Sequence, residues 1–505
     1  MSRWGYPSLA LLTGASVMIF EFGATYLFRG SFGQTVYVWA NVIGVILAAL
    51  ALGYALGGRW ADVTNTEKPL VAVLVFAGVY GLFVAWFGPA FCAWLAGPEE
   101  YTQDAALDAF FSQSLAATLV LFFAPLAALG MATPLMVQRA SAHWPVGRAA
   151  GLIFAVGTVG SIIGIYLTTF TLVPTLGARA TIRLAAAVLL ALGALVFWLG
   201  RRKAGVPAAL MVAAVLPIGW TADWSFLPPQ GAKLLLALES PYQLVRVVDR
   251  PPDADGKRQR WLAFDEGMGT YHSIQVSEET PWTDAYYDAF AYIPAWVGSD
   301  EKCRVCIVGN AAGTMADLLK RHNPLTEFEI DAIEIDPAVT EAARRTMGLQ
   351  DSPDIRIVHE DGRTFLRKQP GERYDAIIMD AYARQVSIPA SLATKEFFEL
   401  AESRLRPGGG LFVNLGTLRY GGVLSKTIAD TMHAGFGDPV YRAPMRGYFN
   451  QLLTVARDAE MNPPPRGTRL DVTYSFGRHL PGNRVLTDDF CPIETITARD
   501  LRGIE

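Results

Sequence analysis

The chain has 505 residues, of which 51% are hydrophobic and 18% are charged. This length predicts at least two domains, and the mean hydropathy of +0.26 is high for a wholly soluble enzyme. The formal net charge of −4 argues against a nucleic-acid-binding protein, because such proteins usually present a basic face. The four cysteines are too few for a disulfide framework in a chain this long.

Most of the apolar residues lie before about Trp224, in stretches long enough to cross a lipid bilayer. One helical crossing takes about 20 apolar residues. Six stretches reach this length, at residues 7–28, 35–58, 69–96, 114–137, 150–173 and 180–199. A seventh, at 205–221, is shorter and contains Pro207 and Pro217. We therefore predict an α-helical transmembrane domain over residues 1–225, with six to seven spans. We do not expect the first stretch to be a cleavable signal peptide, because further apolar stretches follow it at once.

The basic residues between these stretches predict how the bundle is oriented, because cytoplasmic loops carry an excess of lysine and arginine. The side opposite the N-terminus has only Arg29, Arg179 and Arg183. The side of the N-terminus has Arg3, Arg59, Lys68, Arg139, Arg148, Arg201, Arg202 and Lys203. The N-terminus is therefore expected in the cytoplasm. Six spans would return the C-terminal half there, whereas seven would place it outside, and we expect that 205–221 makes no simple crossing.

One acidic residue, Glu21, lies well inside an apolar stretch. A carboxylate at this depth costs about 3 kcal/mol on insertion scales, so it is usually buried, paired or protonated. One interpretation is a polar pocket or proton site within the bundle. The interpretation we favour is a structural pair with an arginine near a helix end, such as Arg29 or Arg59.

From about Lys233 the pattern changes to that of a folded α/β protein. Two predicted strands, Tyr242–Asp249 and Arg260–Phe264, flank a turn at Pro251–Gly256, which indicates a small antiparallel β subdomain over residues 233–280. Residues 283–297 are predicted to form a helix rich in aromatic side chains. From Arg304 onward strands and helices alternate, which is typical of a parallel α/β sheet. We therefore predict a Rossmann-like domain over residues 281–505.

Small and acidic residues follow four successive predicted strands of this domain. The first strand leads into the loop Gly309-Asn-Ala-Ala-Gly313, and the next three end at Glu334, at Asp361-Gly362 and at Asp380. In an open parallel sheet these carboxyl ends share one edge, where nucleotide-like ligands bind. We predict an adenosine site in which the loop approaches the ligand closely, Glu334 accepts from the ribose hydroxyls, and Asp361 meets the adenine.

Other residues near these strands have candidate roles, and several of them have two interpretations. Asp380 is placed to accept a proton from a nucleophile. Tyr286, Tyr287 and Tyr382 either line the cleft or pack in the core. Asp361 also fits an ordinary turn, and Asp336 fits the N-cap of the helix that Pro337 begins. The pair Cys303 and Cys306 would suit redox or zinc chemistry, but they lie in a buried strand without a second ligand pair, so we expect core residues and no metal.

Several short motifs connect the chain to a known family. They are Glu239-Ser-Pro-Tyr-Gln243, Tyr286-Tyr-Asp288, Ile333-Glu-Ile-Asp-Pro337, Glu360-Asp-Gly362, Thr394-Lys-Glu-Phe-Phe398 and Pro407-Gly-Gly409. With them, residues from about 237 to the end resemble spermidine synthases, which are polyamine aminopropyltransferases with a Rossmann-type methyltransferase fold. Residues 14–62, with Leu56-Gly-Gly-Arg-Trp-Ala-Asp62, resemble the membrane half of fused transmembrane spermidine synthase-like proteins.

The resemblance implies a role for each matching residue. Gln243 would meet the tail of the donor, Glu334 the ribose and Asp361 the adenine amino group, while Asp380 would be the base. Residues at the acceptor side or on the cleft wall would be Tyr286, Asp288, Tyr382 and Arg384. The reaction would move an aminopropyl group from decarboxylated S-adenosylmethionine to an amine and leave methylthioadenosine. Because S-adenosyl compounds are made in the cytoplasm, we expect the catalytic domain there, on a bacterial-type inner membrane.

Two positions depart from the family pattern and keep alternatives open. The acid that pairs with the donor's ammonium is replaced by Ala312, and the acid that holds the acceptor amine is replaced by Ala383, followed by Arg384. The pocket would then suit S-adenosylmethionine itself, whose carboxylate would meet Arg384. A methyltransferase, or a transporter or sensor without turnover, are the competing functions. The acceptor, an amine or a molecule delivered through the membrane, and a homo-oligomeric state are left open.

Overall fold

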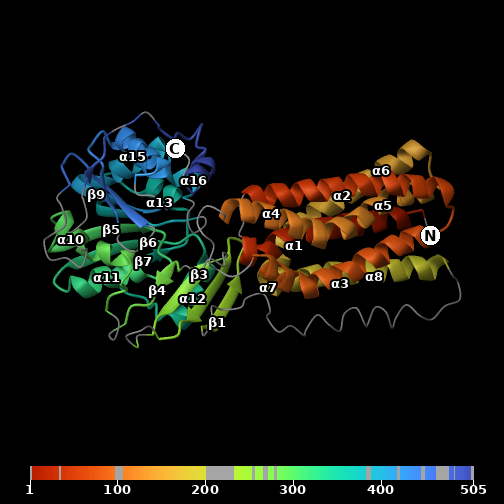
Figure 1. Cartoon of the computed structure of the whole chain (residues 1–505), viewed down its shortest axis with the longest axis horizontal. Helices are drawn as coiled ribbons and strands as arrows, with labels where there is room; N and C mark the ends of the chain where they lie inside the picture. Colours follow the sequence, from red (N-terminus) through yellow and green to blue (C-terminus); the bar gives the residue numbers. More distant parts are fainter. Residues whose placement is uncertain are drawn as a thin grey trace.

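The computed structural model describes most of the chain. The described residues are 3–32, 36–96, 106–200, 232–252, 256, 258–264, 271–277, 281–382, 388–417, 421–444, 450–461, 477–480, 482 and 484–501. The doubtful span at 205–221 and the residues Ala383 and Arg384 lie outside them. The molecule is elongated, with a helical bundle at one end and an α/β domain at the other (Figure 1).

The first 200 residues form the predicted helical bundle. Its helices are α1 (Gly5–Phe32), α2 (Val36–Val63), α3 (Lys68–Ala96), α4 (Ala106–Thr118), α5 (Ala124–Ala140), α6 (Val146–Leu167), α7 (Val173–Leu176) and α8 (Ala178–Gly200). A π-helical turn joins α4 to α5, and another joins α6 to α7. Within the described residues, six helical stretches are long and apolar enough to cross a membrane. The six apolar stretches are confirmed as helices of sufficient length, and their crossing of a membrane stays a prediction.

Close helix pairs hold the bundle together. Helix α1 packs on α6, α2 on α5, and α3 on α8. A side chain at Gly160 would begin 2.0 Å from the backbone oxygen of Leu11, and one at Gly53 would begin 2.2 Å from that of Ala127. Only glycine allows the two backbones to approach this closely, as is usual for helices that associate in lipid.

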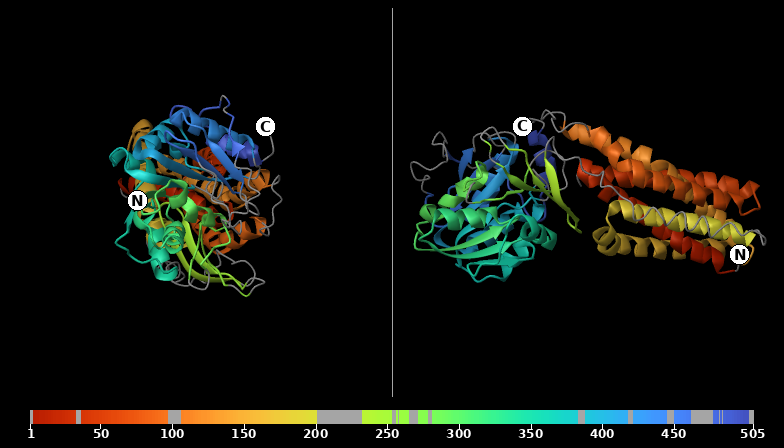
Figure 2. Two further views of the ribbon diagram at one scale, coloured as in Figure 1. Left: turned by 90° about the vertical axis from the view of Figure 1, so that its left-hand side faces the viewer. Right: turned by 90° about the horizontal axis from the view of Figure 1, so that it is seen from below.

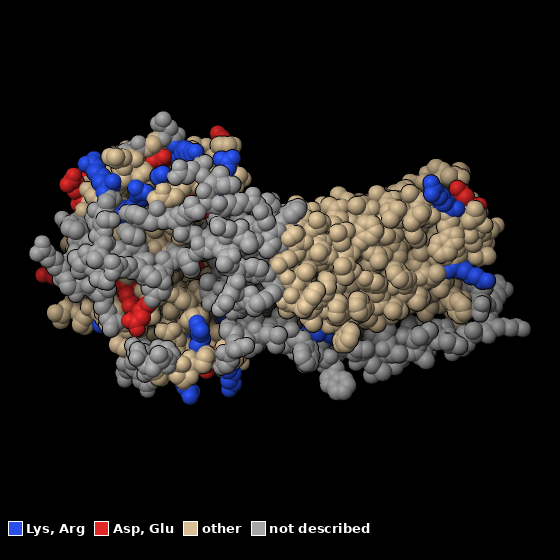
Figure 3. Space-filling view, in the orientation of Figure 1, with Lys and Arg blue, Asp and Glu red and all other residues tan. Residues whose placement is uncertain are grey.

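The two ends of the bundle carry different charge. The N-terminus lies at the end far from the α/β domain, and the further views agree (Figures 1 and 2). The visible face of the bundle is almost free of charged groups except at this far end (Figure 3). The ends of the helices place Arg3, Arg59, Lys68, Arg139 and Arg148 there. Arg29 and Arg179 lie at the near end, where α1 ends and α8 begins.

This arrangement conflicts with one of our expectations about orientation. Helix α8 ends at Gly200 on the far side of the bundle, whereas the α/β half begins on the near side. A bilayer around the bundle would therefore separate the N-terminus from the α/β domain. A cytoplasmic N-terminus and a cytoplasmic catalytic domain, which we expected together, exclude each other in this fold.

A small antiparallel sheet begins the α/β half, as predicted. Its strands, in spatial order, are β1 (Lys233–Glu239), β2 (Leu244–Asp249), β3 (Arg260–Phe264) and β4 (Ser273–Ile274). The region predicted as one helix over 283–297 instead has a 3₁₀ stretch, Tyr286–Tyr292, and a short helix α10, Ile293–Trp296. That prediction was wrong because the Asp288 carboxylate binds the turn at Thr283 and Asp284, and Pro294 favours a new helix start.

The large sheet contains eight strands among the described residues. They are β5 (Lys302–Val308), β6 (Glu327–Ile333), β7 (Ile355–Val358), β8 (Tyr374–Met379), β9 (Leu405–Gly416), β10 (Tyr441–Pro444), β11 (Asn450–Ala456) and β12 (Gly477–Arg478). Their spatial order is β12-β10-β11-β9-β8-β5-β6-β7, and β5 to β9 are parallel.

Helices accompany these strands in the Rossmann-like manner. They are α11 (Thr314–His322), α12 (Pro337–Thr346), α13 (Gly362–Lys368), α14 (Lys395–Arg404), α15 (Val423–Phe436) and α16 (Ile493–Leu501). The strand order reverses between β5 and β8, which both end at the same edge. A crevice at such a reversal is where open α/β sheets bind ligands. The predicted fold class is confirmed, and the reversal locates the candidate site.

Candidate active site

The glycine loop after β5 has a backbone that other residues would not tolerate. Gly309 has a φ of +93°, and a Cβ there would lie 2.3 Å from the backbone oxygen of Asp380. Only glycine combines this dihedral with such a close contact. Gly313, with a φ of +86°, precedes the first residue of α11. The loop therefore passes directly beside the end of β8. The close approach of Gly309 and Gly313 to a ligand stays a prediction.

Glu334 supports the same loop from the end of β6. Its Oε2 accepts from the Ala311 N–H at 2.9 Å, and its Oε1 accepts from the Asp336 N–H at 3.0 Å. Burial raises the pKa of this carboxyl to about 7, although these backbone hydrogen bonds oppose the shift. Each carboxylate oxygen keeps capacity for a second donor. Glu334 can therefore hold the loop and also accept from a ligand hydroxyl.

Gly362, the first residue of α13, packs against the end of β5, and Asp361 directly precedes it. The Asp361 Oδ1 accepts from the Thr364 N–H at 2.8 Å and caps α13. A Cβ at Gly362 would lie 2.4 Å from Cγ1 of Val308, the last residue of β5. The structure thus gives Asp361 a capping role through one oxygen, and its contact with adenine stays a prediction.

Asp380 is a half-buried carboxylate held by side chains from two other segments. Its Oδ2 accepts from the Tyr286 hydroxyl at 2.9 Å, and its Oδ1 accepts from the Asn414 side-chain amide at 2.6 Å. The Asn450 amide in turn donates to Oδ1 of Asn414 at 2.9 Å, which fixes the orientation of the Asn414 amide. Burial raises the pKa of Asp380 to about 6, and the bonds from Asn414 and Tyr286 oppose the shift.

The pKa of Tyr286 is raised well above its ordinary value by burial and by the nearby Asp380. Its hydroxyl therefore stays protonated and remains a donor to Asp380 at neutral pH. The Asp380 carboxylate is largely ionised there, because its pKa of about 6 lies below neutral pH. This pKa lies closer to the working pH than that of an ordinary aspartate, which suits a general base.

Two more of the residues predicted at the acceptor side or cleft wall, Tyr382 and Asp288, mainly support the surrounding backbone. The Tyr382 hydroxyl donates to the backbone carbonyl of Asn414 and accepts from the Gly416 N–H, both at 2.6 Å. It therefore fixes the end of β9 that carries Asn414. The Asp288 carboxylate accepts from the N–H and hydroxyl of Thr283 and from the Asp284 N–H. These bonds give Asp288 a structural role in the turn ahead of Tyr286.

Gln243 belongs to a loop that reaches the site through Asp336. Asp336 caps α12, as predicted, by accepting from the Ala338 N–H at 3.0 Å. Its other oxygen accepts from the Ser240 hydroxyl at 2.6 Å. Burial raises the pKa of Asp336, opposed by side-chain hydrogen bonds with Ser240 and Gln243. Gln243 thus lies beside the residue that supports Glu334, and its contact with a donor tail stays a prediction.

The structure gathers most of the predicted site at one point. Gly309, Gly313, Glu334, Gly362 and Asp380 all belong to, or contact, the end of β5 and its loop, and Asp361 directly precedes Gly362. Arg384 lies outside the described residues. The sequence reasoning missed Asn414, although a polar residue within the apolar stretch Leu411–Leu415 is a usable signal. It also missed Asn310, whose buried side-chain amide has no hydrogen-bond partner on either atom within the described part of the chain.

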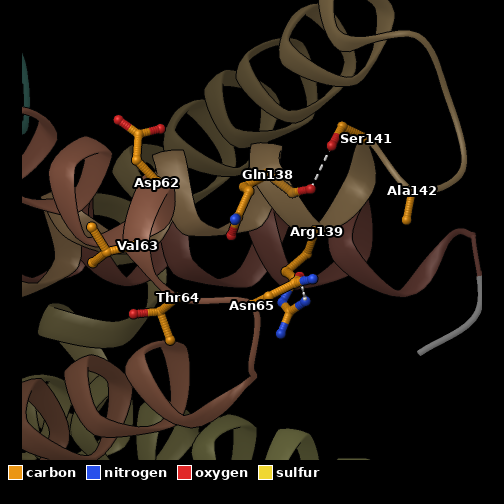
Figure 4. A pocket seen from close by; sticks show the side chains of 8 residues that line it. All are labelled: Asp62, Val63, Thr64, Asn65, Gln138, Arg139, Ser141 and Ala142. Carbon is orange, nitrogen blue, oxygen red and sulfur yellow. Dashed lines mark hydrogen bonds between the residues drawn. The ribbon is translucent and has the colours of Figure 1, made fainter.

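Two other features lie away from this site. A cavity of about 360 Å³ is at the far end of the bundle, lined by Asp62, Val63, Thr64, Asn65, Gln138, Arg139, Ser141 and Ala142 (Figure 4). Cys303 and Cys306 are fully buried in β5, and burial raises the pKa of both thiols, that of Cys303 to about 12. This fits the interpretation of Cys303 and Cys306 as core residues. The described residues contain no group of three or more potential metal ligands.

Sequence comparisons show that part of the α/β half is similar to a known family. Residues 284–463 match the family described as spermine/spermidine synthase domain. A probable polyamine aminopropyl transferase of Bifidobacterium longum is 33% identical over 158 residues, which are 31% of this chain and 33% of that protein. The chain thus spans about a third of the length of that relative.

A second relative is similar along almost the whole chain. Polyamine aminopropyltransferase 1 of Streptomyces coelicolor is 24% identical over 497 residues, which cover 91% of this chain and 84% of that protein. The crystal structure of spermidine synthase from Thermotoga maritima aligns with a TM-score of 0.36 and 19% identity, over 54% of this chain and 88% of that one. These sequence relatives are named as transferases, and residues 284–463 of this chain match the family described as spermine/spermidine synthase domain.

Proposed function

We propose that the protein is a membrane-anchored aminopropyltransferase that uses an S-adenosyl donor. The observation that carries this proposal is the half-buried Asp380 carboxylate, which Tyr286 and Asn414 hold beside the glycine loop. The names of the polyamine aminopropyltransferase relatives agree with it. Glu334, on the other side of the loop, would accept from the ribose hydroxyls of the donor.

The reaction requires the protein mainly to align the two substrates and to supply a base. The acceptor amine gives a proton to the Asp380 carboxylate, and its nitrogen attacks the carbon next to the sulfonium of the donor. The new C–N bond forms as the C–S bond breaks, and the sulfur leaves with the electron pair as neutral methylthioadenosine. Because the leaving group is good, positioning the two reactants contributes most of the acceleration.

The identity of the donor depends on the surroundings of residue 312. Ala312 is buried and packs with Val339, Met347 and other apolar residues, and its N–H donates to the Ser273 hydroxyl at 3.2 Å. An ammonium tail in such surroundings lacks the anion that would offset its loss of water. We propose an aminopropyl donor that binds less tightly than in enzymes with an acid at this position.

This substitution also supports a second candidate, a methyltransferase that uses intact S-adenosylmethionine. Its tail carries both charges and needs no acidic partner. The Ala312→Asp variant separates the two. It should bind decarboxylated S-adenosylmethionine about tenfold more tightly and intact S-adenosylmethionine less tightly, because the new carboxylate attracts the ammonium and repels the carboxylate of the tail. Isothermal titration measures both affinities, with methylthioadenosine, which has no tail charge, as the control ligand.

The direct test is an analysis of the products. The purified full-length protein in detergent is incubated with each donor and with a diamine such as putrescine, and the nucleosides are separated by chromatography. Release of methylthioadenosine supports the proposal, whereas S-adenosylhomocysteine would indicate methyl transfer. Binding of a donor without either product, with several amines, would instead favour a sensor or transporter.

We propose that the α/β domain faces the cytoplasm of a bacterial-type cell, because S-adenosyl donors are made there. The basic residues at the far end of the bundle favour the opposite orientation. Fusions of green fluorescent protein and alkaline phosphatase to the C-terminus decide between them. Fluorescence without phosphatase activity supports the cytoplasmic location. Phosphatase activity would overturn it and would remove the reason for expecting a cytoplasmic donor.

A further inference from the structure

Arg29, at the end of the first membrane helix, contacts the α/β half directly. Its side chain is buried, with the residue 2% exposed. Its Nη1 donates to the Ser240 carbonyl at 3.1 Å, its Nη2 to the Pro241 carbonyl at 3.5 Å, and its guanidinium lies 4.0 Å from the centre of the Tyr26 ring. Burying a cation costs free energy unless partners such as these replace its interactions with water. Arg29 is therefore fixed to the loop of residues 239–243.

The same loop contacts a second membrane helix through a group of opposite charge. The Glu239 carboxylate accepts from the N–H of Ala178, the first residue of α8, with N–O distances of 3.1 and 3.3 Å. A carboxylate at a helix N-terminus is favoured by the free N–H groups and by the helix dipole. Two adjacent residues of the loop, Glu239 and Ser240, are thus held by α8 and by α1 respectively.

The same loop is connected by hydrogen bonds to the residues of the proposed nucleoside pocket. The Ser240 Oγ accepts from the N–H groups of Tyr242 and Gln243. Its hydrogen has two acceptors within reach, Asp336 Oδ2 at 2.6 Å and the Gln243 carbonyl at 3.1 Å, and the shorter distance favours donation to Asp336. The Asp336 N–H donates to Glu334 Oε1, and Glu334 Oε2 accepts from the Ala311 N–H in the glycine loop. A continuous series of hydrogen bonds therefore connects Arg29 to the glycine loop.

We propose that Arg29 is a positioning residue for the nucleoside pocket, acting through Ser240, Asp336 and Glu334. The membrane bundle is then a structural part of the donor site as well as an anchor. This inference rests on the proposed function, because it requires that the pocket binds an adenosine compound. It names no contact between Arg29 and the ligand, and the effect is carried by the placement of Glu334.

The test measures the affinity of the full-length protein for methylthioadenosine in detergent by isothermal titration. Arg29→Gln should weaken binding about tenfold, because hydrogen bonds from a charged group are lost and the loop is released. Arg29→Lys keeps the charge and one donor group, so its affinity should lie between those of wild type and Arg29→Gln. Arg139→Gln is the matched control. Arg139 lies at the far end of the bundle, bonded to Asn65 at 2.8 Å, and its loss should leave the affinity unchanged.

A second variant tests the path itself and does not disturb the membrane helix. Ser240→Ala keeps the carbonyl that Arg29 contacts but removes the bond to Asp336, and it should weaken binding to a similar degree. If both residues act along one path, the double variant should bind no more weakly than the weaker single variant. Wild-type affinity in Ser240→Ala, or fully additive losses in the double variant, would overturn the inference. If the wild-type protein itself does not bind methylthioadenosine, the proposed function fails instead.

Discussion

The two site carboxylates, Glu334 and Asp380, are held in different ways. Glu334 is bonded by backbone N–H groups of Ala311 and Asp336, so it is part of the architecture of the loop that faces the ligand. Asp380 is bonded by the side chains of Tyr286 and Asn414, so its surroundings can change without moving the backbone. From this difference we propose that Glu334 determines whether a nucleoside binds, and that Asp380 determines whether it reacts.

The largest effect is expected where the proposed base is removed. Asp380→Asn keeps the shape of the side chain and its bond with Tyr286, but it cannot accept the proton of the acceptor amine. The kcat should fall about 10²–10⁴-fold, while methylthioadenosine should bind nearly as in wild type. Single-turnover kinetics and isothermal titration on the same sample measure the two quantities. An equal loss of binding would erase the distinction between the two carboxylates.

A smaller loss, and of a different kind, is expected at Glu334. Glu334→Ala removes the ribose acceptor and leaves the Ala311 N–H unpaired, so the affinity for methylthioadenosine and both donors should fall about 100-fold. Glu341→Ala on the neighbouring helix α12 is the control, because the Glu341 side chain is half exposed and forms an ion pair with Arg345 on the same helix. Unchanged nucleoside affinity in Glu334→Ala would rule out the ribose assignment.

The pH dependence should separate the two carboxylates within the wild-type protein. The pKa of Glu334 is about 7 and that of Asp380 is about 6, and both groups must be ionised to act. Nucleoside affinity should therefore weaken as the pH falls through about 7, and kcat should fall below about pH 6. Titrations and rates between pH 5 and 8 measure both profiles. An Asp380→Asn protein whose residual rate still falls below pH 6 would contradict this assignment.

The smallest effect is expected when the support of Asp380 is weakened. Tyr286→Phe removes one donor to Asp380, so the pKa of that carboxyl should rise further and kcat at neutral pH should fall about tenfold. The matched control is Tyr374→Phe. It removes a hydrogen bond to Asp331 of 2.7 Å at the other end of β8 and should leave kcat unchanged. A shift of the kcat profile towards higher pH in Tyr286→Phe alone would sharpen the comparison.

The sequence predicts those parts of this molecule that follow from periodicity and from strand ends. Apolar stretches predict the six spans, and alternating strands and helices predict the sheet. Because the carboxyl ends of parallel strands share an edge, the sequence alone is enough to group Glu334, Asp361 and Asp380. The N-cap role of Asp336 is equally predictable, since the following proline marks a helix start.

The remaining features depend on contacts between distant segments. Arg29 and Ser240 are 211 positions apart, and Asn414 and Asp380 are 34 positions apart, and no local pattern connects either pair. The sequence suggests Arg29 only as a partner for Glu21, because a lone arginine at a helix end gives no sign of a contact outside the bundle. The helix expected over 283–297 failed because the side-chain bonds of Asp288 outweigh the aromatic pattern.

The series of bonds from Arg29 to the glycine loop has a reciprocal consequence. Coupling between two sites acts equally in both directions. If Arg29 tightens nucleoside binding, then a bound nucleoside must stabilise the grip of the loop on α1 by the same factor. The helical half would then respond to the amount of donor in the cell, and a spectroscopic probe at the end of α1 would measure the occupancy of a pocket in another domain.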